Sequence, residues 1–325
     1  MEKNIINFLK MNLYKNKKIE IALLAGGWSG ERDVSIKSGD AVYRALDKER
    51  YNVTRYDPRD DLESLIKARK RIDLAFILLH GKFGEDGSIQ GLLDLLGISF
   101  IGSGLLTSAM AFNKKVAKDI FKNAGLNVIN DEMLYKDKEF SIAQIMDRIG
   151  PSTVVKPVAE GSSLGVSICH NREGLIKGIN QAFLYDQEVM VESYIQGREV
   201  TCCVIGGNEL ETLPIVEIVP EQGHEFFDYK AKYTAGVTRE ICPARLPTAL
   251  KVKVEDCAKK AHKALKCRTW SRIDMIIKGE EVYILEINTI PGMTENSLVP
   301  LAAKAANISL SQLLDRLIEL SLPQQ

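Results

Sequence analysis

The 325-residue chain has no C-x-x-C pair among its six cysteines, no excess of charge of either sign and no long apolar run. The missing cysteine spacing argues against a zinc site or a redox motif. Lys plus Arg and Asp plus Glu both number 43, which disfavours nucleic acid or an anionic membrane as the main partner. No apolar stretch reaches the roughly 18 residues that a transmembrane helix needs. We therefore expect a cytoplasmic protein with reduced thiols and two or three domains.

Residues 1–18 carry isolated apolar positions among Lys and Asn. Leu9 and Leu13 follow Ile5 at helical spacing, but Asn7 and Lys10 interrupt the apolar core, and no small-residue cleavage site follows. A signal peptide is therefore not indicated. We expect a leader that is either a short amphipathic helix or a disordered segment.

Residues 19–112 alternate between apolar and amphipathic segments. The pattern predicts strands over 18–25, 51–56 and 73–80, and helices over 34–46 and 62–69. Such alternation is typical of a parallel α/β domain. Its binding edge should lie at the C-terminal ends of the strands, where the loops with Gly26 and His80 emerge. The glycines lack the full G-x-G-x-x-G pattern, so a dinucleotide site is not indicated.

Residues 113–192 form the second expected domain. A helix is predicted over 113–125 and a strand over 153–156. The next loop, 158–165, is rich in Gly and Ser and follows Lys156, so it can wrap a polyphosphate. It is not a Walker loop, because neither a helix nor Gly-Lys-Ser follows. Taken alone, an ordinary hairpin turn explains it equally well.

Residues 193–325 form the third expected domain. The stretch 206–245 shows little periodicity, and its aromatic and charged part, 221–240, predicts a lid that closes over a ligand. Helices are predicted over 250–266 and 309–322. The apolar face of the closing helix is expected to consist of Leu310, Leu313, Leu317 and Leu320.

Two apolar strands joined by a tight turn carry oxygen-bearing side chains at their outer ends. Glu286 and Asn288 are two residues apart, so a strand points both to one face. With a three-residue turn at 279–281, Asp274 lies opposite Glu286 and Arg272 lies opposite Asn288. Two acids and an amide suit Mg²⁺ bound to a nucleotide. A two-residue turn would put Asp274 on the other face, and a plain edge hairpin with a solvated polar face is the alternative.

These features occur together with further motifs in a specific order. The motifs are Ser29-Gly-Glu-Arg, His80-Gly-Lys-Phe-Gly-Glu-Asp-Gly, Phe100-Ile-Gly-Ser-Gly, Glu160-Gly-Ser-Ser after Lys156, Lys232-Tyr233, Arg272-Ile-Asp, Glu286-Ile-Asn, Pro291-Gly-Met-Thr and Ser297-Leu-Val-Pro. From about residue 19 onward, the chain resembles the ATP-grasp superfamily and, within it, the D-alanine–D-alanine ligase family. The resemblance implies an α/β (overall α+β) ATP-grasp fold of three domains, in which a parallel α/β domain precedes the ATP-grasp pair.

The resemblance also implies a nucleotide site between the second and third domains. Its phosphate-binding residues would be Lys114, Lys156, Glu160, Gly161, Ser162 and Ser163. Glu192 and Ile195 would read the adenine edge, and Glu199 would bind the ribose hydroxyls. Two Mg²⁺ ions, for which Mn²⁺ can substitute, would be held by Asp274, Glu286 and Asn288.

The remaining implied roles belong to the substrates, ATP and two D-alanine molecules. Glu31 would hold the first ammonium group, with His80 nearby, and Ser297 with the Leu298 amide would hold the second carboxylate. Arg272 and the Gly292 amide would form an oxyanion site. Ser162 and Tyr233 would link to Glu31 and close the lid, with Lys232 beside the substrates.

The implied activity is ATP-dependent ligation of two D-alanines through a D-alanyl phosphate, for peptidoglycan precursor synthesis. The alternatives are a ligase of the same fold that uses D-lactate or D-serine, another carboxylate–amine ligase, and a non-catalytic ATP-binding module. Tyr233, where ester-forming relatives have His, favours the dipeptide. Ser193, Ser271 and Ile290 depart from the family pattern without removing a group that the chemistry requires. A homodimer is compatible with the sequence, which does not determine the oligomeric state.

Overall fold

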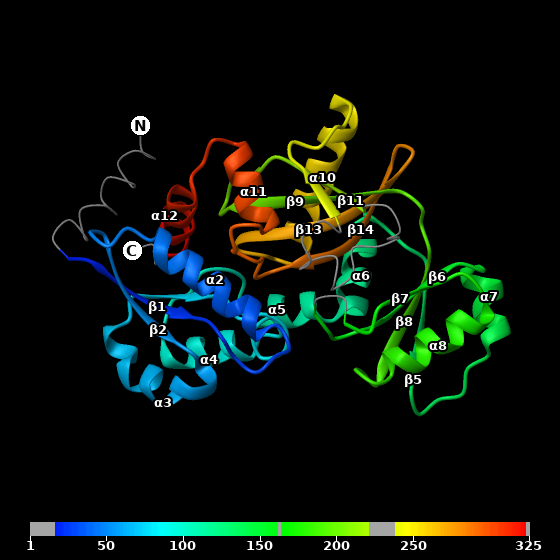
Figure 1. The fold of residues 1–325 in the computed structure, drawn as a ribbon, viewed down its shortest axis with the longest axis horizontal. Coiled ribbons are helices and arrows are strands. Elements are labelled where there is room, and N and C mark those ends of the chain that lie inside the picture. Colours follow the sequence, from blue (N-terminus) through cyan, green and yellow to red (C-terminus); the bar gives the residue numbers. More distant parts are fainter. Residues whose placement is uncertain (1–16, 162–163, 221–237, 323–325) are drawn as a thin grey trace.

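The computed structural model describes residues 17–161, 164–220 and 238–322. Nearly all of the expected leader therefore lies outside the described residues. The residues that are described form three β-sheets with helices packed against them (Figure 1).

The first sheet is parallel and has the strand order β2-β1-β3. Its elements in chain order are β1 (Ile19–Leu24), α2 (Arg32–Ala45), β2 (Tyr51–Tyr56), α3 (Pro58–Ala68), η1 (Arg69–Arg71), β3 (Leu74–Ile77) and α4 (Ser88–Leu96). Every residue of β3 is buried, as in a strand that is covered on both faces. The expected parallel α/β unit is confirmed. The connections after β1 and β3 bring Glu31 and His80 to one edge of this sheet.

The second sheet is antiparallel and has the order β5-β8-β6-β7. Two helices precede it, α5 (Leu105–Phe112) and α6 (Lys114–Asn123). Its own elements are β5 (Asp131–Tyr135), α7 (Ile142–Ile149), β6 (Thr153–Pro157), β7 (Ser167–Cys169), α8 (Arg172–Ala182) and β8 (Glu188–Ser193). Because β6 and β7 pair with each other, the Gly/Ser loop is the connection of a hairpin. Apolar side chains of the sheet, α7 and α8 form a separate core.

The third sheet has seven strands, in the order β12-β11-β9-β13-β14-β4 with β10 beside β9. The strands are β4 (Asn127–Val128), β9 (Arg198–Gly206), β10 (Leu210–Thr212), β11 (Val216–Pro220), β12 (Thr238–Ile241), β13 (Thr269–Lys278) and β14 (Glu281–Asn288). The helices are α10 (Thr248–Ala264), α11 (Leu298–Ala305) and α12 (Leu310–Ser321).

The stretch 206–245 is more regular than its sequence predicts. β10, β11 and β12 all fall within it, and β12 includes residues 238–240 of the expected lid. The rest of that lid, 221–237, lies outside the described residues. Strands this short contain too few alternations for a periodicity to be visible, and they form because β11 pairs with β9 and buries Val216 and Ile218.

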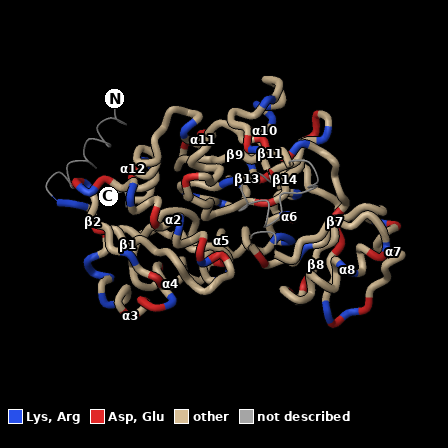
Figure 2. Tube along the Cα trace, in the orientation of Figure 1, with Lys and Arg blue, Asp and Glu red and all other residues tan. Residues whose placement is uncertain are grey.

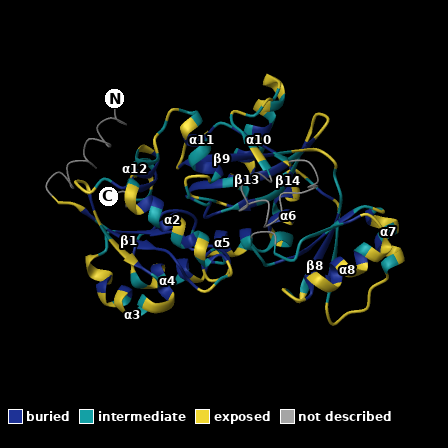
Figure 3. Cartoon of the chain, in the orientation of Figure 1, coloured by how far each residue is buried: buried dark blue, intermediate teal, exposed yellow. Residues whose placement is uncertain are grey.

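Helix α12 joins the first and third sheets. Its apolar residues share one core with β1, β3, β9 and β13; the buried residues of the chain are dark blue in Figure 3. Leu313, Leu314, Leu317 and Ile318 are fully buried, whereas the predicted core residue Leu320 is 37% exposed. Both stripes have helical spacing, so the sequence pattern could not choose between them. The choice is set by the surfaces that α12 contacts, which belong to α2, α11 and β13.

Acidic and basic residues are interspersed along the whole trace (Figure 2), in keeping with the zero net charge. Among the residues that the structure describes, no helix is both long and apolar enough to cross a membrane.

A pair of substitutions on α12 tests which side of this helix packs into the core. Leu317→Ala removes a fully buried side chain and should lower the free energy of unfolding by about 2–5 kcal/mol. Leu320→Ala, on the exposed side of the same helix, should cost at most about 1 kcal/mol. Urea denaturation followed by circular dichroism measures both. Equal losses would contradict the observed orientation of α12.

Candidate active site

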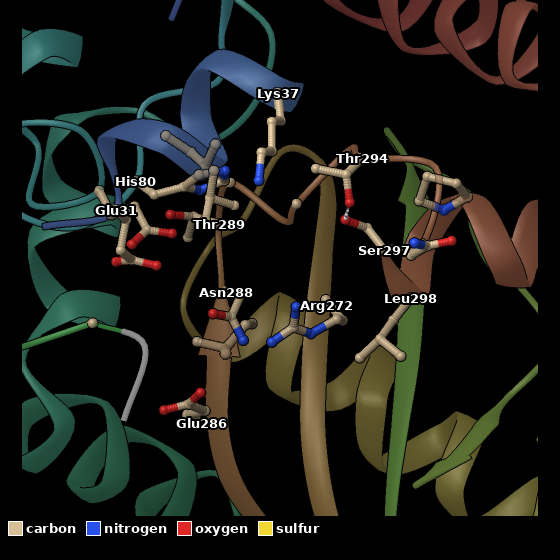
Figure 4. Close-up of a pocket in the computed structure, with 18 of the residues that line it drawn as sticks. Glu31, Lys37, His80, Arg272, Glu286, Asn288, Thr289, Thr294, Ser297 and Leu298 are labelled. Carbon is tan, nitrogen blue, oxygen red and sulfur yellow. Dashed lines mark hydrogen bonds between the residues drawn. The ribbon is translucent and has the colours of Figure 1, made fainter. Parts of the chain in front are cut away.

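Two adjoining cavities contain all the predicted site residues that the structure describes. The first has a volume of about 940 Å³ and lies between the first and third sheets (Figure 4). The second, of about 340 Å³, lies between the second and third sheets. Lys114, Glu160 and Glu286 line both cavities, so they mark the junction between the two. Four predicted residues, Ser162, Ser163, Lys232 and Tyr233, lie outside the described residues.

The junction depends on how β13 and β14 pair. Asp274 lies opposite Glu286 and Arg272 opposite Asn288, as predicted, but the reason given for this register is wrong. The hairpin turn has two residues rather than three, since Lys278 pairs with Glu281. A β-bulge then restores the register, because the pairing skips Leu285.

The bulge places two consecutive side chains on the open face of the sheet, as β-bulges do. Leu285 lines the second cavity, and Glu286 lines both. Ile284 and Ile287, on either side of this pair, stay in the hydrophobic core. Figure 4 shows Arg272, Glu286 and Asn288 directed into the first cavity from the ends of their strands.

The acids at the junction provide the oxygen donors that a divalent cation prefers. Glu286 and Asp274 supply carboxylates, and Asn288 donates through Nδ2 to Asp274 at 3.1 Å, which leaves its amide oxygen directed elsewhere. In the described part of the chain, no group of three or more His, Cys, Asp or Glu could hold a metal, and Asn288 is the third oxygen-bearing side chain beside these two acids. The donor set therefore fits Mg²⁺ or Mn²⁺ in type and number, with room for phosphate oxygens.

Asp274 is already paired with a cation. Nε and an Nη of Arg272 donate to its two carboxylate oxygens at 2.9 and 2.7 Å, and Thr201 Oγ1 donates at 2.5 Å. Asp274 is therefore ion-paired within the protein before any metal binds.

The first cavity has a buried acid and a buried imidazole at one end. Glu31 is buried at the N-cap position of α2, where its side chain makes no capping hydrogen bond, and His80 follows β3. Burial, together with the nearby Arg272 cation, lowers the pKa of His80 to about 4. Its Nε2 has no hydrogen-bond partner among the described residues. A neutral, buried ring nitrogen at a cavity wall is well suited to contact a polar ligand.

Glu31 is also in close contact with the Gly/Ser loop. A Cβ atom added to Gly161 would come within 2.6 Å of Glu31 Oε2. Only glycine therefore lets the loop approach this carboxylate without displacing it.

Glu85 is a site residue that the sequence reasoning missed. It lies in the His80-to-Gly87 motif and lines the first cavity, and Gly81 N–H donates to its Oε2 at 2.8 Å. Loss of solvent contact and the neighbouring Glu31 raise the pKa of Glu85 to about 8. Lys37 of α2, directed into the same cavity in Figure 4, was also missed. Both were visible only as charged residues within motifs or helices, which by themselves indicate a solvated surface.

The opposite end of the first cavity is a helix N-terminus. Ser297 precedes α11, and Leu298 is its first residue, so the Leu298 amide points out of the helix. Ser297 Oγ lies 2.7 Å from Thr294 Oγ1 and accepts from Thr294 N at 3.0 Å. Gly292 packs against Ser297 here. Amides at a helix N-terminus favour an anionic group such as a carboxylate.

Lys114 lines both cavities, and Lys156 lines the second. Lys114, the first residue of α6, donates to the carbonyl oxygen of Glu160. Lys156 of β6 pairs with Glu192 of β8 at 2.5 Å. The second cavity continues past Glu192 to Ile195 and Glu199. Ser193, a departure from the family pattern, donates to the Ile149 carbonyl at 2.7 Å.

The chain matches two family models, "D-ala D-ala ligase N-terminus" over residues 57–103 and "D-ala D-ala ligase C-terminus" over residues 120–319. It is 51% identical over 306 residues to the D-alanine–D-alanine ligase of Syntrophobacter fumaroxidans, which covers 94% of this chain and 98% of that one.

Two solved structures share the fold. The D-alanine–D-alanine ligase of Bacillus anthracis complexed with ATP is 36% identical, with a TM-score of 0.80 and coverage of 94% of this chain and 97% of that one. The VanG D-Ala:D-Ser ligase of Enterococcus faecalis is 31% identical, with a TM-score of 0.81 and coverage of 94% and 100%. The resemblance and the fold inferred from the sequence motifs are confirmed: the chain belongs to the D-alanine–D-alanine ligase family, with its ATP-grasp fold.

Proposed function

We propose that the protein joins two D-alanine molecules into D-alanyl-D-alanine at the expense of ATP. The observation that carries this proposal is the junction of the two cavities at Lys114, Glu160 and Glu286. A nucleotide in the second cavity would present its terminal phosphate to a carboxylate in the first. The dipeptide would serve peptidoglycan precursor synthesis. All six cysteines are unpaired, which supports a cytoplasmic location.

In this proposal the second cavity binds ATP. Glu192 and Ile195 face the adenine, Glu199 binds the ribose, and Lys114 and Lys156 hold the phosphates, with the Gly/Ser loop covering them. The apolar walls around Leu285 and Ile276 suit a purine ring. The Bacillus anthracis relative was solved in complex with ATP, which supports ATP as the nucleotide. The proposed domains are residues 19–112, 113–192 and 193–325, with the nucleotide between the last two.

Asp274, Glu286 and Asn288 would hold two Mg²⁺ ions, which neutralise phosphate charge when they are bound. Arg272 would change partner during the reaction. It pairs with Asp274 in the structure, and its position beside Asn288 at the cavity wall would let it contact the oxyanion that develops later.

The two amino acids would bind at opposite ends of the first cavity. Glu31 attracts the first ammonium group, and neutral His80 faces the same molecule. Ser297 and the Leu298 amide hold the second carboxylate. This arrangement directs the first carboxylate and the second amine toward each other, and such positioning is worth several orders of magnitude in rate.

The reaction then proceeds in two steps. A carboxylate oxygen of the first D-alanine attacks the γ-phosphorus, and ADP leaves, which gives an acyl phosphate. The second amine loses a proton and attacks the carbonyl carbon, and inorganic phosphate leaves as the amide forms. Arg272 and the Gly292 amide stabilise the negative oxygen of the tetrahedral intermediate. Ser162, Lys232 and Tyr233 would close the lid over these steps.

The second candidate is a D-Ala–D-Ser ligase, which the similarity to VanG favours. The two candidates differ only in the second acceptor, because Glu31 and His80 would act on the first D-alanine in both.

Acceptor choice tests the proposal. With ATP and Mg²⁺ at about pH 7–8, D-alanine alone should support phosphate release and dipeptide formation, and L-alanine should not. Added D-lactate should give little ester, because Tyr233, with a reference pKa of about 10, brings no cation that would repel the ammonium of D-alanine. Dominant D-Ala–D-Ser or D-Ala–D-lactate product would contradict the dipeptide assignment.

Tyr233→His should move the product toward ester, most strongly at low pH, because protonated His repels the ammonium group. Tyr233→Phe, which stays neutral, should keep the dipeptide preference. Chromatography of the products measures both. The same ester fraction in the two variants would remove Tyr233 from acceptor choice.

Glu286→Gln should lower turnover by roughly 100-fold or more and weaken Mn²⁺ binding, because it removes a charged ligand at the junction. The melting temperature of this variant should stay within about a few degrees of that of the unaltered protein. Glu281→Gln, at the exposed start of the same strand, is the matched control and should leave turnover unchanged. Full Mn²⁺ affinity in Glu286→Gln would rule out this residue as a ligand.

Gly161→Ala should displace the Glu31 carboxylate and raise the KM for the first D-alanine by roughly ten-fold or more. Gly207→Ala, where a Cβ atom has nothing within 4 Å, is the control. Initial rates at varied D-alanine measure the effect. An unchanged KM in Gly161→Ala would show that the loop does not constrain Glu31.

A further inference from the structure

The carboxylate of Glu192 is held between two lysines from different elements. Lys156 of β6 contacts Oε2 at 2.5 Å, and Lys118 of α6 contacts Oε1 at 2.5 Å. Glu192 is 3% exposed. Burial by itself would raise the pKa of this group, but the charges of Lys156 and Lys118 outweigh it and hold the pKa below its ordinary value. The ionised form therefore depends on the lysines.

The two lysines stand on different sides of Glu192. Lys156 and Glu192 both line the second cavity, whereas Lys118 lines neither of the two cavities. Lys118 is 6% exposed, and its ammonium also lies 3.2 Å from Asp131 and 3.9 Å from the sulfur of Met190. It cannot touch a nucleotide directly, so any effect on binding must act through Glu192.

When a nucleotide is bound, two groups would compete for the ammonium group of Lys156. The phosphates require its ammonium group, while Glu192 requires a cation to remain ionised in a buried position. Without Lys156, Glu192 would still have a cation in contact, because Lys118 lies 2.5 Å from Oε1. Lys118 is shared with Asp131, which is also paired with Lys115.

We propose that Lys118 is a positioning residue for adenine recognition. From the side of Glu192 that faces away from the cavity, it keeps this carboxylate ionised and in place, so that Lys156 is available to the phosphates. The proposal rests on the nucleotide roles given above to Glu192 and Lys156. An ionised Glu192 accepts a hydrogen bond from the adenine amino group. It would repel the carbonyl oxygen that hypoxanthine carries at the same position. A protonated Glu192 would tolerate both bases, because a carboxylic acid can donate as well as accept.

The test compares ATP with ITP. Steady-state phosphate release gives kcat and KM for each, and calorimetry gives the affinities for ADP and IDP without turnover. The unaltered protein should prefer the adenine nucleotide by roughly 10- to 100-fold, the range of a hydrogen bond to a charged group. Lys118→Met should bring this preference within about three-fold and raise the KM for ATP more than it lowers kcat.

Lys115→Met is the matched control. Lys115 is on the same helix and is more exposed, and it pairs with Asp119 and Asp131. The adenine preference of this variant should stay within about two-fold of the unaltered protein. Lys118→Arg, which retains the positive charge, should recover most of the preference that Lys118→Met loses.

The outcomes separate the two claims. If the unaltered protein binds neither ADP nor IDP, the nucleotide site of the proposed function is wrong. If it prefers ADP and Lys118→Met keeps that preference, only the role of Lys118 is wrong. Should Lys118→Met not fold, Lys118→Gln takes its place, because it retains a buried hydrogen-bond donor. The expected loss of adenine preference is the same, because Gln carries no charge. Failure of both to fold would make Lys118 a structural residue and overturn the proposal.

Discussion

The register of β13 against β14 is the constraint on which the site depends. A two-residue turn alone would place Asp274 and Glu286 on opposite faces, and the bulge at Leu285 brings them to the same face. The core is not disturbed, because Ile284 and Ile287 both stay buried. One inserted residue therefore supplies an apolar wall for one cavity and an acid at the junction of the two.

Buried carboxylates in this protein are stabilised in two ways. Asp274 and Glu192 are paired with Arg272 and with Lys118 and Lys156, so their charges are balanced before any ligand binds. Glu31 and Glu85 lie together at the first cavity, and there the balance is reached instead through a raised pKa at Glu85. Lys114 and Lys156 line the cavity that is proposed to take polyphosphate, together with carboxylates that include Glu192 and Glu286. Glu31 and Glu85 line the end of the first cavity that is proposed to take an ammonium.

Much of this fold could be predicted from the sequence. The parallel first sheet followed from strand and helix alternation, and the residues that line the cavities followed from motifs in a specific order. The bulge could not be predicted, because the extra residue, Leu285, is itself apolar and hides the break in alternation between the buried Ile284 and Ile287. The buried stripe of α12 was misassigned at Leu320, since two stripes fit helical spacing and tertiary contacts choose between them. Lys118 and Glu85 were overlooked because a charged residue on a helix or in a loop is usually solvated.

The central claim is that a carboxylate in the first cavity attacks the phosphate of a nucleotide in the second. D-alanine labelled with ¹⁸O in its carboxylate tests this claim most directly, because the proposed reaction transfers one carboxylate oxygen to the phosphate. Mass spectrometry of the phosphate released with ATP and labelled D-alanine should show one ¹⁸O per phosphate for each dipeptide formed. Dipeptide formation with unlabelled phosphate would contradict the acyl phosphate intermediate. It would also contradict the proposed reaction between a carboxylate in the first cavity and a nucleotide phosphate in the second.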